Sequence, residues 1–211
     1  MINVSKYFDI CHVTATPLVR VTPTANPTEA AQTGCQTTPG GRAYGYLPGA
    51  PLTTTLAPPD LPGQRLVISG TVYASDCITP LPNVLVEVWH TDSTGRYDRS
   101  EPFILRAQMY TNSNGRHEFT TTRPGHYQSG DITRPAHIHY RVSQQGSEPL
   151  ATRLLFADDP HLTGISENSR LVTSLSERTK PGGPIFYGTF DLILPAVPPA
   201  PTPEILTDED L

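Results

Sequence analysis

Between residues 65 and 194 the chain repeats short runs of β-branched and apolar residues, separated by Gly, Pro, Asn and Asp. Runs of this length that end at turn residues predict β-strands rather than helices. The run 84–90 is apolar at nearly every position, so we expect it in the middle of a sheet. Asn114-Gly115 predicts a hairpin between two of the runs. We expect strands at 66–73, 84–90, 108–111, 117–121, 134–142, 151–156 and 185–194.

Composition supports this reading and adds two less regular ends. Proline is frequent, at 23 residues, and strong helix formers are scarce. We therefore predict an all-β protein, with a single-domain β-sandwich over 35–194 that has long loops and few short helices, one of them at 167–176. We predict that segment 1–34 is an irregular N-terminal arm. We predict that 195–211 is a flexible tail, which is Pro-rich and then acidic.

The charge pattern and the cysteines limit the class of partner. With a net charge of −5, the chain lacks the excess of basic residues that is typical of nucleic-acid-binding proteins. No apolar run is long enough to span a membrane. The first residues lack the apolar core of a signal peptide, so we expect a cytoplasmic protein, although a secreted form with its signal removed would look the same. Cys11, Cys35 and Cys77 form no zinc motif, and a Cys35–Cys77 disulfide would need an oxidising compartment.

The main candidate for chemistry lies in the run 134–142. His137 and His139 are two residues apart, so on a strand both imidazoles point to the same face, about 6 to 7 Å apart along the chain. Two imidazoles on one rigid strand can reach a single metal ion, and imidazole suits Zn, Cu, Fe and Ni alike. Two unrelated surface histidines are the alternative.

Two tyrosines precede this strand in unusual settings. Tyr97 follows the turn at Gly95-Arg96, and Tyr127 ends the sequence Arg123-Pro124-Gly125-His126-Tyr127. Taken singly, each is better explained as a half-buried tyrosine whose hydroxyl is hydrogen-bonded. Their order and spacing relative to the His pair give the more specific signal.

The three motifs together resemble those of the intradiol ring-cleavage dioxygenases, the non-haem Fe(III) enzymes of the catechol 1,2-dioxygenase and protocatechuate 3,4-dioxygenase type. The motifs are Trp-His-x-Asp-x-x-Gly-Arg-Tyr at 89–97, Pro-Gly-x-Tyr at 124–127 and Arg-Pro-Ala-His-Ile-His at 134–139. The resemblance extends from about Cys35 to Leu194. It implies one Fe(III) per chain, held by Tyr97, Tyr127, His137 and His139.

The implied reaction follows from these ligands. Phenolate is a hard anionic donor that suits a trivalent cation, and a bound cation lowers the tyrosine pKa from its usual value of about 10. The resemblance implies that a catechol-type diol is cleaved with O₂ between its two hydroxyl-bearing carbons, which gives a cis,cis-muconic acid. It further implies that Tyr127 gives way to the diol and takes one of its protons, and that Arg134 stabilises negative charge on the ring.

Two departures from the family pattern bear on the substrate. The family carries Gln where this chain has Arg153, and Arg is not a conservative replacement. Our hypothesis is that Arg153 lies at the iron pocket and favours substrates with an extra anionic group; the alternative is that it turns outward. The family's Glu-Gly-Pro-Tyr-Tyr is replaced by Arg-Ala-Tyr-Gly-Tyr at 42–46, where Tyr46 and, less directly, Tyr44 are expected in a pocket wall.

Other interpretations of the function also remain possible from the sequence. Residues 70–97 also resemble non-catalytic transthyretin-like β-sandwich modules, which do not need the His-x-His strand or Tyr127. An iron-binding but inactive relative is a second alternative, and a zinc hydrolase is disfavoured because no carboxylate accompanies the His pair. The substrate among catechol derivatives and any homo-oligomeric assembly are also open.

The remaining histidines are not expected to bind the metal. His90 and His126 flank the ligand positions, and we expect His90 to pack beneath the site and His126 to lie at its rim. His117 and His161 are expected to be ordinary surface residues.

Overall fold

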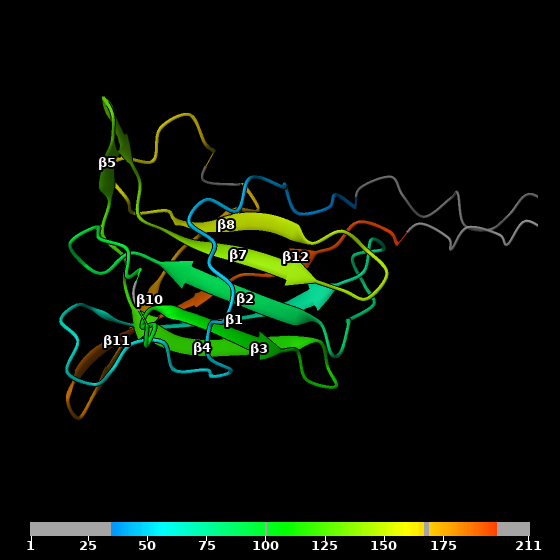
Figure 1. Ribbon diagram of the computed structural model, residues 1–211, viewed down its shortest axis with the longest axis horizontal. Helices are drawn as coiled ribbons and strands as arrows, with labels where there is room; N and C mark the ends of the chain where they lie inside the picture. The colour runs from blue at the N-terminus through cyan, green and yellow to red at the C-terminus, as the bar shows by residue number, and fades with distance from the viewer. Residues whose placement is uncertain (1–34, 100, 167–168, 198–211) are drawn as a thin grey trace, which may run out of the picture. The chain divides into compact units, whose positions relative to one another are not determined.

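The computed structural model describes residues 35–99, 101–166 and 169–197, and within them it contains strands but no helix (Figure 1). The predicted arm 1–34, Cys11 and most of the predicted tail lie outside the described residues. In the part that is described, no helix is long and apolar enough to cross a membrane.

Two five-stranded sheets and a short two-stranded ribbon make up the fold (Figure 1). The first sheet contains β10 (Ser176–Lys180), β11 (Gly183–Thr189), β1 (Arg65–Tyr73), β12 (Leu192–Ile193) and β4 (Arg116–Thr122). The second has the order β3 (Arg106–Tyr110), β2 (Leu85–His90), β7 (His137–Ser143), β8 (Leu150–Phe156) and β9 (Val172–Thr173). The ribbon pairs β5 (Tyr127–Ser129) with β6 (Ile132–Arg134).

The hydrophobic core lies between the two sheets, as predicted for a β-sandwich. Ile68 and Phe119 come from the first sheet, and Val86, Ile138 and Leu154 from the second, and all five are fully buried. Burial alternates strictly along β1, as the two faces of a strand require. Each such side chain contributes about 1.5–3 kcal/mol through its removal from water.

The opposite face of the second sheet carries polar residues and is covered by the segment 38–57, which we call the covering segment. The strand register places Arg106, Trp89, His139 and Arg153 in one row across β3, β2, β7 and β8. The covering segment is tied to both sheets through backbone hydrogen bonds, for example from the Gln108 N–H to a carbonyl of that segment at 2.9 Å. This arrangement encloses one face of the row.

The predicted hairpin at Asn114-Gly115 is wrong as a strand pairing. A turn does form there, since the Asn112 N–H donates to the Arg116 carbonyl at 3.0 Å. Beyond it the strands separate, because β3 pairs with β2 in one sheet and β4 pairs with β1 in the other. The turn therefore connects the two layers of the sandwich.

Two predicted elements are interrupted. The run 185–194 divides into β11 and β12, because the Asp191 carboxylate accepts the Thr71 N–H at 2.8 Å in place of a ladder carbonyl. The run 134–142 divides at Pro135-Ala136 into β6 and β7. The ends of each interrupted run remain extended.

The predicted helix at 167–176 is also wrong in its described part. Val172–Thr173 forms β9, parallel to β8, and Ser176 begins β10. Val and Thr are β-branched and fit a pleated strand. The Leu155 N–H also donates to the Leu171 carbonyl at 2.7 Å, which draws this segment onto the sheet edge.

A disulfide joins Cys35 to Cys77, with the two Cα atoms 5.9 Å apart. Cys77 lies in the connection between β1 and β2, so the bond fastens the start of the described chain to that connection.

Candidate metal centre

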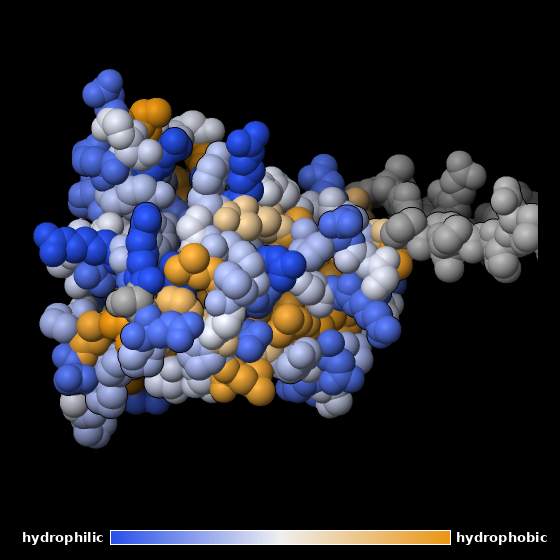
Figure 2. Space-filling view, in the orientation of Figure 1, coloured by the Kyte–Doolittle hydropathy of each residue, from blue (hydrophilic) through white to orange (hydrophobic). Residues whose placement is uncertain are grey.

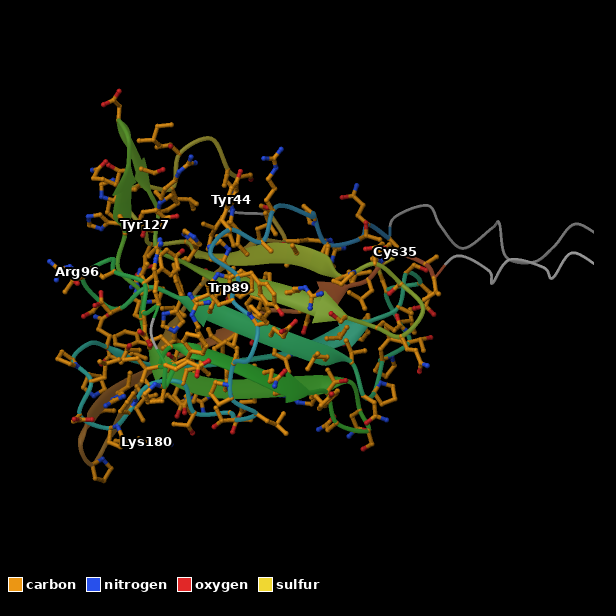
Figure 3. The ribbon with its side chains drawn as sticks, viewed as in Figure 1. Cys35, Tyr44, Trp89, Arg96, Tyr127 and Lys180 are labelled. Atoms are coloured by element: carbon orange, nitrogen blue, oxygen red, sulfur yellow. A yellow bond between two sulfur atoms is a disulfide. The ribbon has the colours of Figure 1, made fainter. Side chains whose placement is uncertain are left out.

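Four side chains from three segments meet at one end of the second sheet. His137 and His139 come from β7, Tyr97 from the loop after β2, and Tyr127 from the first position of β5. Tyr127 lies at the foot of the β5–β6 ribbon, and Trp89 and Tyr44 lie over the sheet nearby (Figure 3). These are the four residues that the motifs predicted as ligands.

Three of the potential ligand atoms lie very close together. The Tyr97 Oη is 3.0 Å from His139 Nε2 and 3.5 Å from His137 Nε2, and the two nitrogens are 3.1 Å apart. Donors that bind one ion at about 2.0–2.1 Å are separated by about 3 Å from one another. The Tyr127 ring is 5.7 Å from the Tyr97 ring and 5.7 Å from the His137 ring, measured between centroids.

The hydrogen bond of the His137 ring leaves its other nitrogen free to bind a metal. Its Nδ1 donates to the Pro135 carbonyl at 2.7 Å, so in the neutral ring Nε2 carries a lone pair. That lone pair faces the His139 Nε2 and the Tyr97 oxygen. A cation between them would accept electron density from all three atoms, and the donor set therefore fits a metal ion.

Burial keeps both imidazoles in the form that binds metals. Burial lowers the pKa of His137, and it lowers that of His139 to about 3, with contributions from the nearby His137 and Arg153. Both rings are therefore neutral at pH 7. Burial, followed by the neighbouring Tyr127, raises the pKa of Tyr97, so its phenol ionises at neutral pH only beside a strong positive charge.

The kind of metal follows from the phenols. Among the described residues, no three His, Cys, Asp or Glu side chains are grouped so that they could hold a metal ion. A metal bound at this site would therefore depend on tyrosine oxygens, which favour a hard, highly charged ion. This agrees with Fe(III) and disfavours a zinc hydrolase.

The loops that carry the two tyrosines are locked together. The Asp92 carboxylate accepts the N–H groups of Thr94 at 2.8 Å and Arg96 at 3.0 Å, which shapes the turn before Tyr97. The Gly125 N–H donates to the Asp92 carbonyl at 2.8 Å. At Gly95, φ is +84°, and an added Cβ would lie 2.2 Å from the His126 carbonyl oxygen. Only glycine fits this contact.

The histidines outside the ligand set behave differently from one another. His90 is buried as expected, and both ring nitrogens are engaged, with Thr91 O at 2.6 Å and Thr121 Oγ1 at 2.7 Å. His126 is exposed, and its ring lies 4.4 Å from that of His161. The expectation that His117 lies on the surface is wrong: it is 2% exposed, because its position on β4 faces the core between the sheets.

Arg134 and Arg153 both lie near enough to the ligand cluster for their charges to act on His137. Arg134 pairs with Tyr127 across the β5–β6 ribbon, and its charge contributes to lowering the pKa of His137. Arg153 pairs with His139 and shares its face of the sheet. Together with Arg42, Tyr44 and His139 it lines a cavity of about 150 Å³.

Tyr46 lies differently from Tyr44. Its hydroxyl donates to Glu87 Oε1 at 2.9 Å, Glu87 pairs with Arg141, and the Arg141 guanidinium lies 5.0 Å from the Tyr46 ring centroid. Tyr46 is not among the residues that line the cavity beside His139.

Sequence reasoning missed three contributors to the site. Trp89 stacks on His139 with centroids 4.8 Å apart and planes 9° apart. Arg106 is buried and donates to the carbonyls of Asp98 at 3.2 Å and Gly45 at 3.0 Å. Arg42 lines the cavity. Trp89 was visible within the first motif, but its contact with His139 depends on the pairing of β2 with β7.

Comparison with known proteins assigns the chain to a family. The family model described as Dioxygenase matches residues 46–196, which is more than half of the chain and includes the four potential ligands. The chain belongs to the intradiol dioxygenase family. This family implies non-haem iron. A match that spans both sheets favours membership over the transthyretin-like alternative.

Relatives in the family include enzymes with several named substrates. The chain is 32% identical to a catechol 1,2-dioxygenase of Acinetobacter baylyi in an alignment of 184 residues that covers 71% of this chain and 59% of that protein. It is 30% identical to a protocatechuate 3,4-dioxygenase beta chain of Burkholderia cepacia in an alignment of 153 residues that covers 63% of this chain and 65% of that one. The chain thus spans less than two thirds of the length of these intradiol dioxygenases.

Solved structures of family members have the same fold. The dioxygenase domain of a dioxygenase carbohydrate-binding protein fusion from Streptomyces sp. SirexAA-E matches with a TM-score of 0.65 and 31% identity, over 76% of this chain and 99% of that one. The 3-chlorocatechol 1,2-dioxygenase of Rhodococcus opacus 1CP matches with a TM-score of 0.66 and 26% identity, over 81% and 77%.

Proposed function

We propose that this chain is an active intradiol dioxygenase. It holds one Fe(III) through Tyr97, Tyr127, His137 and His139, and it opens a catechol-type ring with O₂ between the two hydroxyl-bearing carbons to give a cis,cis-muconic acid. The observation that supports this most directly is the convergence of the Tyr97 oxygen and the two imidazole Nε2 atoms within 3.0–3.5 Å.

The two tyrosines have different roles in this proposal. When bound, Fe(III) supplies a Lewis acid that draws electron density from a chelated diol. Tyr97 lies within 3.5 Å of both imidazole nitrogens and is the permanent anionic donor. Tyr127 begins a short ribbon at the edge of the cluster, so it is placed to take a proton from the incoming diol.

The surrounding residues keep the cluster in place and tune its charge. Trp89 holds the plane of His139 by stacking, and the Pro135 carbonyl fixes the orientation of His137. Arg134, opposite Tyr127 in the ribbon, supplies positive charge where the diol anion would lie. Trp89 and His139 are buried beneath segment 38–57, at 2% and 4% exposure.

The experiment is a visible spectrum of the iron-loaded protein, taken without oxygen before and after addition of catechol. We expect a red-brown colour from phenolate-to-Fe(III) charge transfer and a shift of the band to longer wavelength when catechol chelates. Admission of O₂ should then produce a muconic acid, detected by its ultraviolet absorption. A protein that stays colourless after iron reconstitution would contradict the proposed site, and a coloured protein that cleaves no diol would identify an inactive relative.

Matched tyrosine variants assign the roles. Tyr97→Phe should lose most of the visible band, whereas Tyr127→Phe should keep a band from Tyr97 and cleave catechol at least about 100-fold more slowly, the usual scale for loss of an acid–base group. Tyr110→Phe is the control, because Tyr110 is 59% exposed at the end of β3 and should behave as the wild type.

A further inference from the structure

The cavity beside His139 is lined by positively charged side chains, although the chain as a whole is negative. The protein carries a net charge of −5. Among the residues that line the cavity of about 150 Å³, however, there are two arginines, Arg42 and Arg153, and no carboxylate. The cavity also adjoins the potential ligands, because His139 contributes to its wall.

The backbone of both arginines is fixed by β8, either as part of the strand or through hydrogen bonds to it. Arg153 is itself a β8 residue, paired with His139. Arg42 follows Gly41, whose N–H donates to the Ala151 carbonyl at 2.7 Å, and the Thr152 hydroxyl donates to the Pro39 carbonyl at 2.8 Å. The two charges are therefore brought to one cavity by fixed main chain.

Neither guanidinium is satisfied within the described part of the chain. Three more deeply buried arginines differ in this respect: Arg141 pairs with Glu87, Arg123 pairs with Asp158 and Arg106 donates to backbone carbonyls. The guanidinium groups of Arg42 and Arg153 make no hydrogen bond or ion pair with any described residue. A guanidinium offers a planar set of N–H donors that matches a carboxylate. Two guanidinium groups that line one cavity repel each other, and a bound anion would offset this repulsion.

We propose that Arg42 and Arg153 form an anion subsite, and that the diol this protein accepts carries a carboxylate on its ring or on a short side chain. The inference rests on the proposed function, since the diol end is assigned to the metal centre. It makes Arg42 and Arg153 specificity-determining residues. Tyr44, which also lines the cavity, provides an aromatic wall.

Binding of three simple ligands separates the two ends of the substrate. 3,4-Dihydroxybenzoate has both the diol and the anion, 3,4-dihydroxybenzamide has only the diol, and benzoate has only the anion. Affinities are measured by anaerobic calorimetry on the iron-loaded protein. Metal-free protein is followed by fluorescence of Trp89, the only tryptophan of the chain, which stacks on His139.

We expect the iron-loaded protein to bind the acid at least about tenfold more tightly than the amide at low salt, the scale of one charge-assisted hydrogen bond. The preference should shrink as salt is added, because both arginines are exposed. Benzoate should bind more weakly than dihydroxybenzoate, since it lacks the diol.

Single variants test the two residues. Arg153→Gln and Arg42→Gln should each lose most of the acid preference and leave the amide within about twofold, and Arg153→Lys should keep part of it because the charge remains. Arg116→Gln is the matched control, with the same change of charge on an exposed position of β4 in the other sheet. It should retain the full preference.

Benzoate binding as tight as that of dihydroxybenzoate would show that the diol adds no affinity, which would contradict diol binding at the metal centre and hence the proposed function. Two results would overturn the subsite: equal affinities for acid and amide in the wild type, or an equal loss of the acid preference in Arg116→Gln. These are distinct from failure of the proposed function. Cleavage of catechol without any acid preference would remove the subsite alone. Absence of colour and of cleavage would remove the function, while the acid-to-amide ratio in metal-free protein would still report on Arg42 and Arg153.

Discussion

Trp89 shows how one side chain connects the metal centre to the segment that covers it. Its ring stacks on His139, and its Nε1–H donates to the Tyr44 carbonyl at 2.9 Å. Tyr46 contacts the same indole edge-on, with centroids 5.6 Å apart. Because Trp89 is 2% exposed, it has little freedom to rotate, and this rigidity is passed to the His139 ring.

His117 is a residue whose burial predicts a dependence of stability on pH. Both of its ring nitrogens are buried without a partner among the described residues, and burial lowers the pKa to about 4. In the unfolded chain the value returns to about 6.5, so the unfolded state binds the proton first. The stability contribution is complete above pH 6.5 and falls as the pH approaches 4, by about 3 kcal/mol.

We therefore expect His117→Leu to flatten the decline of stability between pH 7 and pH 4.5. The measurement is urea unfolding of chelator-treated protein, followed by Trp89 fluorescence. His161→Leu, at a partly exposed position, is the control and should leave the slope unchanged. His90 has a similarly lowered pKa, so some slope will remain in the variant. An unchanged slope in His117→Leu would contradict this account.

At the scale of elements, the site depends on two loops that lock together between strands. The turn before Tyr97 contacts the backbone before Tyr127, and the β5–β6 ribbon then places Tyr127 opposite Arg134. Pro135 ends the ribbon, and β7 begins with His137. One ligand from a loop, one from the ribbon and two from the sheet are thus brought together in space.

Gly95→Ala should separate the two loops and reduce iron binding. Its Cβ would meet the His126 carbonyl oxygen, which belongs to the backbone and cannot rotate away. Gly164→Ala is the matched control, because its φ is also positive, at +71°, and no heavy atom lies within 4 Å of the added Cβ. Both variants should lose about 1 kcal/mol of stability from backbone strain.

Only Gly95→Ala should also lose iron, measured by metal analysis after reconstitution. Full iron occupancy with an unchanged visible band in this variant would show that the two loops do not need to touch for the ligands to converge.

The strand pattern predicted most elements but not their partners. Alternation along β7 was sufficient to put His137 and His139 on one face, because that depends on local geometry alone. The partners of β3 and β4 could not be predicted in this way. The Asn114-Gly115 turn is compatible with two strands that pair with each other and equally with two strands that belong to separate sheets. Likewise, Arg153 lies beside His139 through the pairing of β7 with β8, which no local pattern encodes.

At the scale of the molecule, the second sheet serves two purposes. One face supplies core residues such as Ile138 and Leu154, and the other carries the row from Arg106 to Arg153 beneath the covering segment. Hydrophilic residues dominate the surface seen in Figure 2, with apolar residues scattered among them. Stability and chemistry are therefore placed on opposite sides of one rigid layer.

The disulfide should stabilise the whole fold without affecting the metal centre. It closes a loop with a sequence separation of 42 residues. The chain-entropy relation gives about 4 kcal/mol for a loop of that length. Replacement of Cys35 and Cys77 by Ser should lower the free energy of unfolding by up to this amount and leave the visible band of the iron-loaded protein unchanged. A loss below about 1 kcal/mol would contradict the expectation.

The same bond provides a test of compartment. The expectation of a cytoplasmic protein stays a prediction, and cytosolic conditions generally keep such pairs reduced. Trapping of free thiols in whole cells, before the protein is extracted, would show which state the protein occupies.

The two ends of the described chain lie side by side at a distance from the metal centre. The Thr38 N–H donates to the Ile193 carbonyl at 2.9 Å, and the Ile193 N–H donates to the Thr38 hydroxyl at 2.8 Å. Cys35 lies at the opposite end of the sheets from Tyr127 (Figure 3). Adjacent ends of this kind allow a domain to be inserted into a host loop or circularly permuted. The described domain can thus be carried within another protein, or fixed to a solid support at this end, with its cavity open to solution.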